Sequence, residues 1–184
     1  MLKLKAASYY SRCRYEEAVD VYRRARVKNP ADVDLLMGLA WALCHAMRFE
    51  DAEQAFSEAL RNSPENVAAF HGLATVFGLR GEVDRELFCY QRILQVDPTD
   101  AFTNFVMGNT YTQMGEYAKA VTAYRRALFS YPNHTLILCS KASALMKMHR
   151  YDDAEADFRA VLQLKPGHRR ALAGLAELER AYAA

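Results

Sequence analysis

The sequence predicts an all-helical protein of stacked repeats, an α-solenoid, and two observations support this. Proline recurs every 34 residues, at Pro30, Pro64, Pro98, Pro132 and Pro166. A fixed period of this length is typical of proteins that stack one small structural unit many times. Within each period, apolar residues recur three or four positions apart, which is the spacing of a buried stripe on an α-helix.

The period also divides the chain. If each proline is position 32 of a repeat, full repeats cover residues 33–66, 67–100, 101–134 and 135–168. An earlier repeat, 1–32, lacks its first two positions, and a half-repeat at 169–184 follows the last full one. With 184 residues, the chain is long enough to bury a sizeable core. We expect one domain over residues 1–184.

Two positions of the repeat carry small side chains. Position 8 holds Ala6, Ala40, Ala74, Gly108, Ala142 and Ala176, and position 20 holds Ala18, Ala52, Ala120 and Ala154. Small groups at fixed points let two helix backbones approach closely. Position 24 is aromatic throughout, with Tyr22, Phe56, Tyr90, Tyr124 and Phe158. We expect these rings to fill the space that the small residues leave.

Each repeat is expected to contain two helices joined by a short turn. In repeat 101–134 the two apolar stripes are Met107, Tyr111 and Met114, then Val121, Tyr124 and Leu128. The proline ends the second helix because it cannot continue it. Asp32, Asn66 and Asp100 follow a proline by two residues and suit the cap of the next helix. Gly81 and Gly115 supply permissive backbone in two of the turns.

Charges follow the same period. The second helix of a repeat tends to open with acids, such as Glu16 and Glu17, and to close with bases, such as Arg125 and Arg126. This order matches the helix dipole. It predicts a solvated outer face rather than a binding patch.

Repeat 67–100 departs from the pattern, since Glu86 stands at position 20 and Ile93 at the often small position 27. A buried carboxylate without a partner is costly, so Glu86 must reach solvent, meet a cation or form a local hydrogen bond. The favoured interpretation is that the helix pair opens slightly and the charge leans outward, and the alternative is a flexible joint or a contact site. If the carboxylate has no satisfied role, replacing Glu86 with Ala raises the melting temperature.

The half-repeat 169–184 suits one amphipathic capping helix, at about residues 169–182. A stack of repeats needs a terminal element that covers its last apolar face. Glu177, Glu179 and Arg180 give this helix the polar outer side that a cap requires.

Together these positions resemble the tetratricopeptide repeat family, over the whole chain. The segment AFTNFVMGNTYTQMGEYAKAVTAYRRALFSYPN matches its pattern most clearly. The resemblance implies a right-handed superhelix of antiparallel helix pairs, with first helices lining a concave groove and second helices outside. It also implies a non-enzymatic function, in which the groove binds a peptide or helix of a partner protein, as adaptors and chaperones do.

In this family, positions 2, 5, 9, 12 and 13 of the first helix point into the groove. The partner-binding candidates carried over in this way are Met37, Trp41, His45, His71, Thr75, Phe102, Phe105, Asn109, Thr112, Gln113, Ser143 and Met146. Large apolar groups at exposed positions indicate a partner site, and the polar ones suit hydrogen bonds to a ligand backbone. The alternative is that some of the rings fold back onto neighbouring helices.

One subgroup of the family grips acidic chaperone tails through a clamp of basic and asparagine side chains. The matching positions here are Lys3, Ala7, Gly38, Ala68 and Gly72, of which only Lys3 fits. We therefore expect no affinity for such tails.

Other functional classes find little support in the sequence. A net charge of +2, without a basic stripe, argues against a nucleic-acid partner. No cofactor is expected, no metal site is indicated by the five histidines and four scattered cysteines, and no catalytic motif is present. No apolar run is long enough to span a membrane. Unpaired cysteines and the lack of a signal segment favour a cytoplasmic location.

A second functional hypothesis is structural assembly. The chain begins directly with a repeat, so copies of the protein could join through repeat ends, or through the convex outer face. This self-association is compatible with peptide binding, and a homo-oligomer is its expected product.

Overall fold

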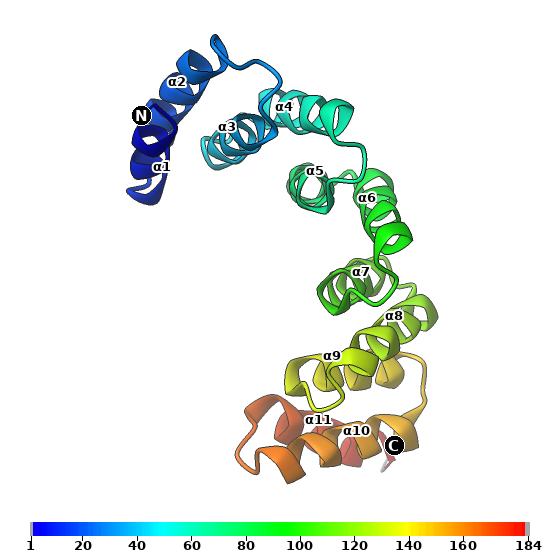
Figure 1. Ribbon diagram of the computed structural model, residues 1–184. Helices are drawn as coiled ribbons and strands as arrows, with labels where there is room; N and C mark the ends of the chain where they lie inside the picture. Colours follow the sequence, from blue (N-terminus) through cyan, green and yellow to red (C-terminus); the bar gives the residue numbers. More distant parts are fainter. Residues whose placement is uncertain (1, 183–184) are drawn as a thin grey trace. The chain divides into compact units, whose positions relative to one another are not determined.

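The computed structural model describes residues 2–182, which form eleven helices and no strand (Figure 1). The helices are α1 Leu2–Ser11, α2 Tyr15–Arg26, α3 Val33–His45, α4 Phe49–Asn62, α5 Val67–Arg80, α6 Val83–Val96, α7 Ala101–Gln113, α8 Tyr117–Ser130, α9 Thr135–Lys147, α10 Tyr151–Leu164 and α11 Arg169–Tyr182. The predicted all-helical fold is confirmed, with two helices in each repeat and one helix in the final half-repeat.

Contacts divide the chain into two compact units, Met1–Val96 with α1 to α6 and Asp97–Ala184 with α7 to α11. Within each unit every helix packs against the next one in sequence. First helices also contact one another: α1 touches α3, α3 touches α5, α7 touches α9 and α9 touches α11. A single domain over residues 1–184 stays a prediction.

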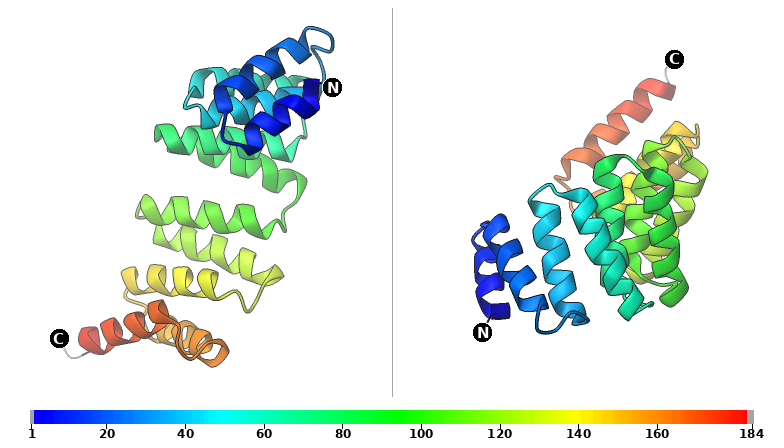
Figure 2. Two further views of the ribbon diagram at one scale, coloured as in Figure 1. Left: turned by 90° about the vertical axis from the view of Figure 1, so that its left-hand side faces the viewer. Right: turned by 90° about the horizontal axis from the view of Figure 1, so that it is seen from above.

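The second helices differ from the first helices in their contacts with one another. Among the described residues, α2, α4 and α6 do not approach one another as the first helices do, and neither do α8 and α10. In unit 1, α1, α3 and α5 accordingly lie on one side and α2, α4 and α6 on the other (Figures 1 and 2). Closer packing of the first helices puts them on the inside of each unit's curve. We call the surface made by the first helices of a unit its inner face.

Side-chain caps begin three of the first helices. Asp32, Asn66 and Asp100 each accept a hydrogen bond from the backbone N–H three residues later, at 3.1, 2.9 and 2.9 Å. Each bond satisfies a donor that the first turn of a helix leaves without an intrahelical partner. The caps predicted from the sequence are confirmed.

The five turns inside the repeats share one geometry. Each is closed by a backbone N–H that donates to the carbonyl five residues earlier, as from Arg48 to Leu43 at 2.9 Å and from Glu82 to Phe77 at 2.9 Å. This closure requires a left-handed residue just before the donor. Gly81 and Gly115 supply it as predicted, with φ of 72° and 77°. In the other turns Cys13, Met47 and His149 adopt φ of 57°, 61° and 58°.

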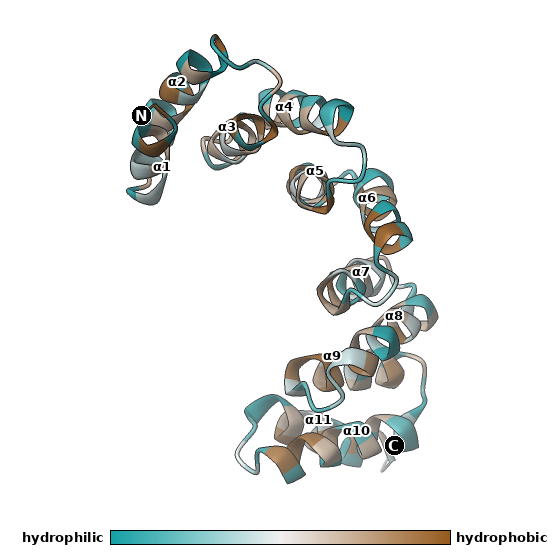
Figure 3. Ribbon diagram, in the orientation of Figure 1, coloured by the Kyte–Doolittle hydropathy of each residue, from teal (hydrophilic) through white to brown (hydrophobic). Residues whose placement is uncertain are grey.

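The core consists of the small and aromatic positions that the sequence singled out. Ala6, Ala18, Ala40, Ala52, Ala74, Ala120, Ala142 and Ala154 are at most 1% exposed. The position-24 rings are at most 7% exposed. Ala176, at position 8 of α11, is the exception and is exposed. Apolar residues lie mainly within the helices, whereas helix ends and loops are mostly hydrophilic (Figure 3).

Three of these rings pack directly on the backbone of the next repeat. Tyr22 lies over Gly38, Phe56 over Gly72 and Phe158 over Gly174, so close that an added Cβ would lie 2.5, 2.2 and 2.3 Å from the ring. All three glycines occupy position 6 of their repeats. Gly38 and Gly72 were compared with the chaperone-tail clamp, but this packing role was not predicted, and Val106 and Ser140 stand at position 6 in two other repeats.

Glu86 has a local partner. The hydroxyl of Tyr90, one turn later on α6, donates to Glu86 Oε1 at 2.9 Å. Burial raises the pKa of Tyr90, and the neighbouring carboxylate raises it further, so the phenol stays a neutral donor. Gly78 gives the carboxyl group room, since an added Cβ there would lie 3.3 Å from it. Glu86 is half-buried, so the local hydrogen bond is present alongside partial contact with solvent.

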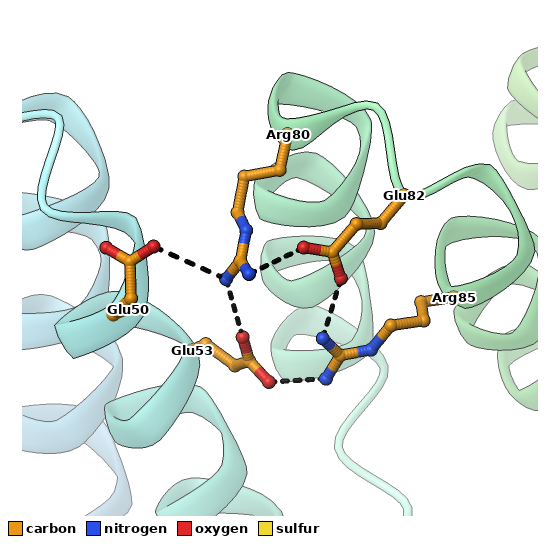
Figure 4. A network of polar contacts seen from close by, with 5 residues as sticks. All are labelled: Glu50, Glu53, Arg80, Glu82 and Arg85. Atoms are coloured by element: carbon orange, nitrogen blue, oxygen red, sulfur yellow. Dashed lines mark hydrogen bonds and ion pairs between the residues drawn. The ribbon is translucent and has the colours of Figure 1, made fainter.

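Ion pairs join neighbouring repeats of unit 1 (Figure 4). Arg80 contacts Glu53 at 2.9 Å and Glu82 at 2.6 Å, and Arg85 contacts Glu82 at 2.7 Å and also pairs with Glu53. The four side chains form a closed ring of alternating charge, to which Glu50 adds a longer contact of 3.8 Å to Arg80. The ring fastens α4 to the turn between α5 and α6. Its arginines are therefore neutralised within the unit.

We expect Met47→Gly to raise the free energy of unfolding by about 0.5–1 kcal/mol. A left-handed conformation strains a residue with a side chain but not glycine, and the gain exceeds glycine's extra loss of chain entropy. Denaturant unfolding measures the change. The reverse test is Gly81→Ala, which should lower the stability by about 1 kcal/mol, because nothing lies within 4 Å of the added Cβ and only backbone strain changes. Equal stability of Met47→Gly and wild type would contradict this account.

The ring-on-glycine contacts predict that Gly72→Ala destabilises the chain by about 1–2 kcal/mol. The new methyl group forces the buried Phe56 ring aside, and this overpacking outweighs the higher helix propensity of alanine. Gly78→Ala, in the same helix, is the matched control. Only the flexible end of Glu86 lies near it, so stability should stay level or rise by up to about 1 kcal/mol. Equal effects of the two substitutions would refute the packing argument.

The Tyr90 hydrogen bond reverses the expectation that Glu86→Ala raises the melting temperature. The substitution leaves the buried Tyr90 hydroxyl without its acceptor, so we expect stability to fall by about 1 kcal/mol. Glu86→Gln keeps an acceptor oxygen and should remain close to wild type. Thermal unfolding followed by circular dichroism compares the three chains, and a higher melting temperature for Glu86→Ala would show that the bond contributes nothing.

Candidate functional site

The inner face of unit 1 carries an aromatic cluster. Trp41 is half-buried and meets the Phe56 ring edge-on, with centroids 5.3 Å apart. His45 is exposed, stacks on Tyr15 at 4.9 Å and meets Tyr10 edge-on at 5.5 Å. The structure thus brings the candidates Trp41 and His45 together, with centroids 6.4 Å apart. Both rings also lean on neighbouring helices, which was the alternative considered for some of the candidates.

Three other candidates of unit 1 lie farther along the same face. Met37 on α3 and His71 on α5 are half-buried, and Thr75 is exposed. The Thr75 hydroxyl donates to the carbonyl of His71 at 2.9 Å, within its own helix. Its proton is therefore already used, and only its oxygen lone pairs remain for a ligand.

On unit 2, Phe102 and Phe105 line an apolar hollow of about 390 Å³. Phe102 is 62% exposed, whereas Phe105 is half-buried with its ring 6.1 Å from that of Tyr124. The remaining lining residues are Ala101, Tyr131, His134, Leu136 and Ile137. The lining contains no carboxylate, lysine or arginine. We call it the Phe102 hollow.

Of the seven lining residues, only Phe102 and Phe105 are among the candidates predicted from the sequence. Tyr131 and His134 lie in the loop between α8 and α9, where no groove position was expected. The sequence does contain a signal for Tyr131. Tyr131 stands at position 31, where the other repeats carry Asn29, Ser63, Asp97 and Lys165. An aromatic residue in an otherwise polar turn indicates that the turn contributes to an apolar surface.

Next to this hollow, Tyr124 ties two candidates to the core. Its hydroxyl donates to Asn109 Oδ1 at 2.8 Å and lies 3.0 Å from Thr112 Oγ1, which is 2.9 Å from the Gly108 carbonyl. Burial raises the pKa of Tyr124, so the phenol remains protonated. These bonds fix the orientation of Asn109. Within residues 2–182 its side-chain NH₂ has no hydrogen-bond partner, so that group can serve a ligand.

A second hollow, of about 280 Å³, lies between α9 and α11. The candidates Ser143 and Met146 line it together with Lys147, Phe158, Arg170, Ala173, Gly174 and Glu177. The Ser143 hydroxyl donates to the Cys139 carbonyl at 2.8 Å, as Thr75 does in its own helix. We call this the Arg170 hollow. Gln113 is exposed at the end of α7 and lines neither hollow.

The Arg170 hollow is cationic. Neither Lys147 nor Arg170 forms an ion pair with any described residue, although Glu177 lines the same hollow. The positive charge of Arg170 favours the ionised forms of the Tyr124 hydroxyl and the Cys139 thiol, so its own contribution lowers the pKa of each. Burial outweighs this effect and raises the pKa of Cys139, so the thiol is protonated and unreactive. Arg170 remains available for a carboxylate from outside.

Residues 2–182 contain no group of three or more histidine, cysteine, aspartate or glutamate side chains placed to hold a metal ion. None of the helices that these residues form is both long and apolar enough to cross a membrane.

Comparison with solved structures supports the fold. The chain superposes on a tetratricopeptide repeat protein from Parabacteroides merdae ATCC 43184 with a TM-score of 0.83 and 20% identity, covering 96% of this chain and 70% of that one. YrrB, described as a TPR protein with an unusual peptide-binding site, gives 0.77 and 19%, covering 95% and 90%. MamA gives 0.77 and 19%, covering 86% of each chain. At these identities the likeness shows the fold alone.

No curated protein matches the sequence significantly. The family model of the tetratricopeptide repeat matches residues 4–67 and 46–101, which together span 98 of the 184 residues. A second model, of anaphase-promoting complex, cyclosome, subunit 3, matches residues 80–161. The first match covers more than half of the chain and agrees with the helix pairs, caps and core positions described above. The chain therefore belongs to the tetratricopeptide repeat family, whose members are protein-interaction scaffolds and not enzymes.

Proposed function

We propose that this chain binds a peptide segment of a partner protein along the inner face of unit 2, as an adaptor or chaperone does. The observation that carries the proposal is the Phe102 hollow. Contiguous exposed apolar surface, such as Phe102 together with the open hollow beside it, usually marks a site that a partner covers. The volume of the Phe102 hollow, about 390 Å³, is within the range of sites that hold small ligands.

A bulky apolar side chain of the partner fits this hollow. Five of its lining residues are Phe102, Phe105, Tyr131, Leu136 and Ile137, which offer rings and branched side chains. Aromatic and aliphatic anchors that enter such pockets provide most of the binding energy in protein interfaces. We therefore expect phenylalanine, leucine, methionine or tryptophan at the anchor position of the ligand.

The length and charge of the ligand follow from α9. This helix runs from Leu136 in the Phe102 hollow to Lys147 in the Arg170 hollow, eleven residues or roughly 16 Å of helix. An extended peptide covers that length with about five residues. Arg170 and Lys147 lack ion-pair partners in the described part of the chain, so a carboxylate placed four to six residues from the anchor would meet them. The Asn109 side-chain NH₂ can bind a carbonyl in between.

The comparisons support a peptide as the ligand class. YrrB, which has the same fold, is described as having a peptide-binding site. In unit 1, the Trp41 and His45 cluster is the corresponding aromatic surface. We assign it a secondary role, because Trp41 and His45 already pack against Phe56, Tyr10 and Tyr15.

The test starts with peptides selected from a random display library against the purified chain. Fluorescence anisotropy then measures their affinity for wild type and variants. We expect Phe102→Ala to weaken binding about 10–100-fold, the loss typical of a truncated anchor. Arg170→Gln should weaken the binding of acidic peptides by roughly fivefold or more, with the larger loss at low salt because the interaction is ionic.

Phe129→Ala is the matched control. Phe129 is 85% exposed on α8, a second helix, so removing its ring should leave affinity unchanged. Selected peptides that bind Phe102→Ala as tightly as wild type, or that lose affinity on Phe129→Ala instead, would rule out the proposed site.

A further inference from the structure

The outer surface of α6 carries a large apolar side chain at a position where the other repeats carry polar or small ones. Phe88 is 58% exposed at position 22. The other repeats carry Asp20, Gln54, Thr122 and Ala156 at that position. Phe88 also lines an apolar hollow of about 360 Å³ between α4, α5 and α6, together with Ser57, Leu60, Phe70, Leu73 and Phe77.

The hollow is open partly because Ser57 is short. At its position 25 the other repeats carry Arg23, Gln91, Arg125 and Arg159, whose longer side chains cover more surface. Two guanidinium groups stack on its aromatic walls, Arg85 over Phe77 at 3.9 Å and Arg92 over Phe70 at 5.8 Å from the ring centroids. The surface is thus apolar at its centre and charged at its edge.

The charged side chains at this edge differ in whether they already have an ion-pair partner within the chain. Arg85 is neutralised by Glu53 and Glu82 within the ring of alternating charge (Figure 4). Arg92 donates to Gln95 Oε1 at 2.9 Å, a neutral acceptor, and has no ion pair within residues 2–182. Asp84 lines the hollow, is exposed, and likewise has no ion pair in the described part of the chain.

Asp84, Phe88 and Arg92 form one row on α6. They are four residues apart, so they lie on the same side of the helix, with the two charges separated by about 12 Å along its axis. Phe88 is midway between an unpaired acid and an unpaired base. Such a row is complementary to its own copy running in the opposite direction, because a twofold axis beside Phe88 brings each acid opposite the other copy's base.

We propose that two copies of this chain associate through α6, with the helices antiparallel and related by a twofold axis. Asp84 of each copy pairs with Arg92 of the other, and the two Phe88 rings cover each other and the adjoining hollows. In a twofold contact every interaction occurs twice, so one row supplies two ion pairs and a shared apolar centre. The rows at four-residue spacing are those that interlock when two helices pack.

The exposed ring on α8 of a second copy is a poorer partner for the α6 surface, because its neighbours do not complement Arg92. Phe129 on α8 is 85% exposed, but the residues before it include Arg125 and Arg126. Two bases beside the ring would repel Arg92 rather than pair with it. The self-complementary row therefore identifies α6 of a second copy as the occupant. This association uses second helices and is independent of the proposed peptide site.

Sedimentation velocity of the purified chain over a wide dilution series tests the proposal. Wild type should be a dimer at high concentration and dissociate on dilution. Asp84→Arg and Arg92→Asp should each raise the dimer dissociation constant roughly tenfold or more, since each substitution places like charges opposite one another twice. Circular dichroism establishes that each variant is folded, and either variant alone suffices if the other fails to fold.

The sharpest test of the paired charges mixes the two single variants and measures whether they form a heterodimer. Asp84→Arg and Arg92→Asp chains, each monomeric alone, should form a heterodimer when combined, because every contact then joins opposite charges. The double variant should self-associate again for the same reason. Arg126→Asp, at the position of Arg92 in the next repeat, is the control and should dimerise like wild type. Wild type that stays monomeric, single variants that dimerise like wild type, or folded variants that fail to combine would each overturn the proposal.

Discussion

One contact is central to unit 1, in which the aromatic ring at position 24 packs on the bare backbone of a glycine at position 6 of the following repeat, and Phe158 on Gly174 repeats this contact in unit 2. Phe56 is fully buried over Gly72, and burial of such a ring contributes about 2–3 kcal/mol. At the three glycine positions the contact limits how closely successive helix pairs approach, since an added side chain there would have to displace the ring. The contact brings the first helices together and places positions 2, 5 and 9 on the inner face. The candidate binding surface is a consequence of this packing.

The same packing determines which polar groups are free for a partner. Hydroxyls that looked available in the sequence, on Thr75 and Ser143, donate to carbonyls of their own helices. Tyr124 fixes Asn109 from the core side. Among the charged groups, the arginines of the alternating ring are neutralised internally, whereas Arg170 and Arg92 have no ion pair within residues 2–182. The two proposed interactions follow from this division: a peptide carboxylate for Arg170 on an inner face, and a second copy's Asp84 for Arg92 on the outside.

Periodicity was sufficient to predict the helices, their caps and the small and aromatic core positions, because these depend on register alone. It could not predict features that depend on the length and rotamer of individual side chains. The Glu86 carboxylate meets a hydroxyl of its own helix, which rotamers decide rather than spacing. Lys141 and Asp157 form a largely buried ion pair at 2.9 Å, at positions where other repeats are mostly apolar. Burial raises the pKa of Asp157 despite this partner. Tyr131 contributes to a hollow from a turn, and only its departure from the polar residues of the other turns hinted at this role.

A partner peptide bound as proposed lies on the inner face of unit 2, between the two hollows. Two-dimensional NMR of the isotopically labelled chain, titrated to saturation with a selected peptide, shows which residues the peptide contacts. We expect the largest shift changes at residues of α7 and α9 that line the Phe102 hollow and at Arg170 of α11. Changes concentrated on α8 and α10, with the inner face unaffected, would contradict this expectation.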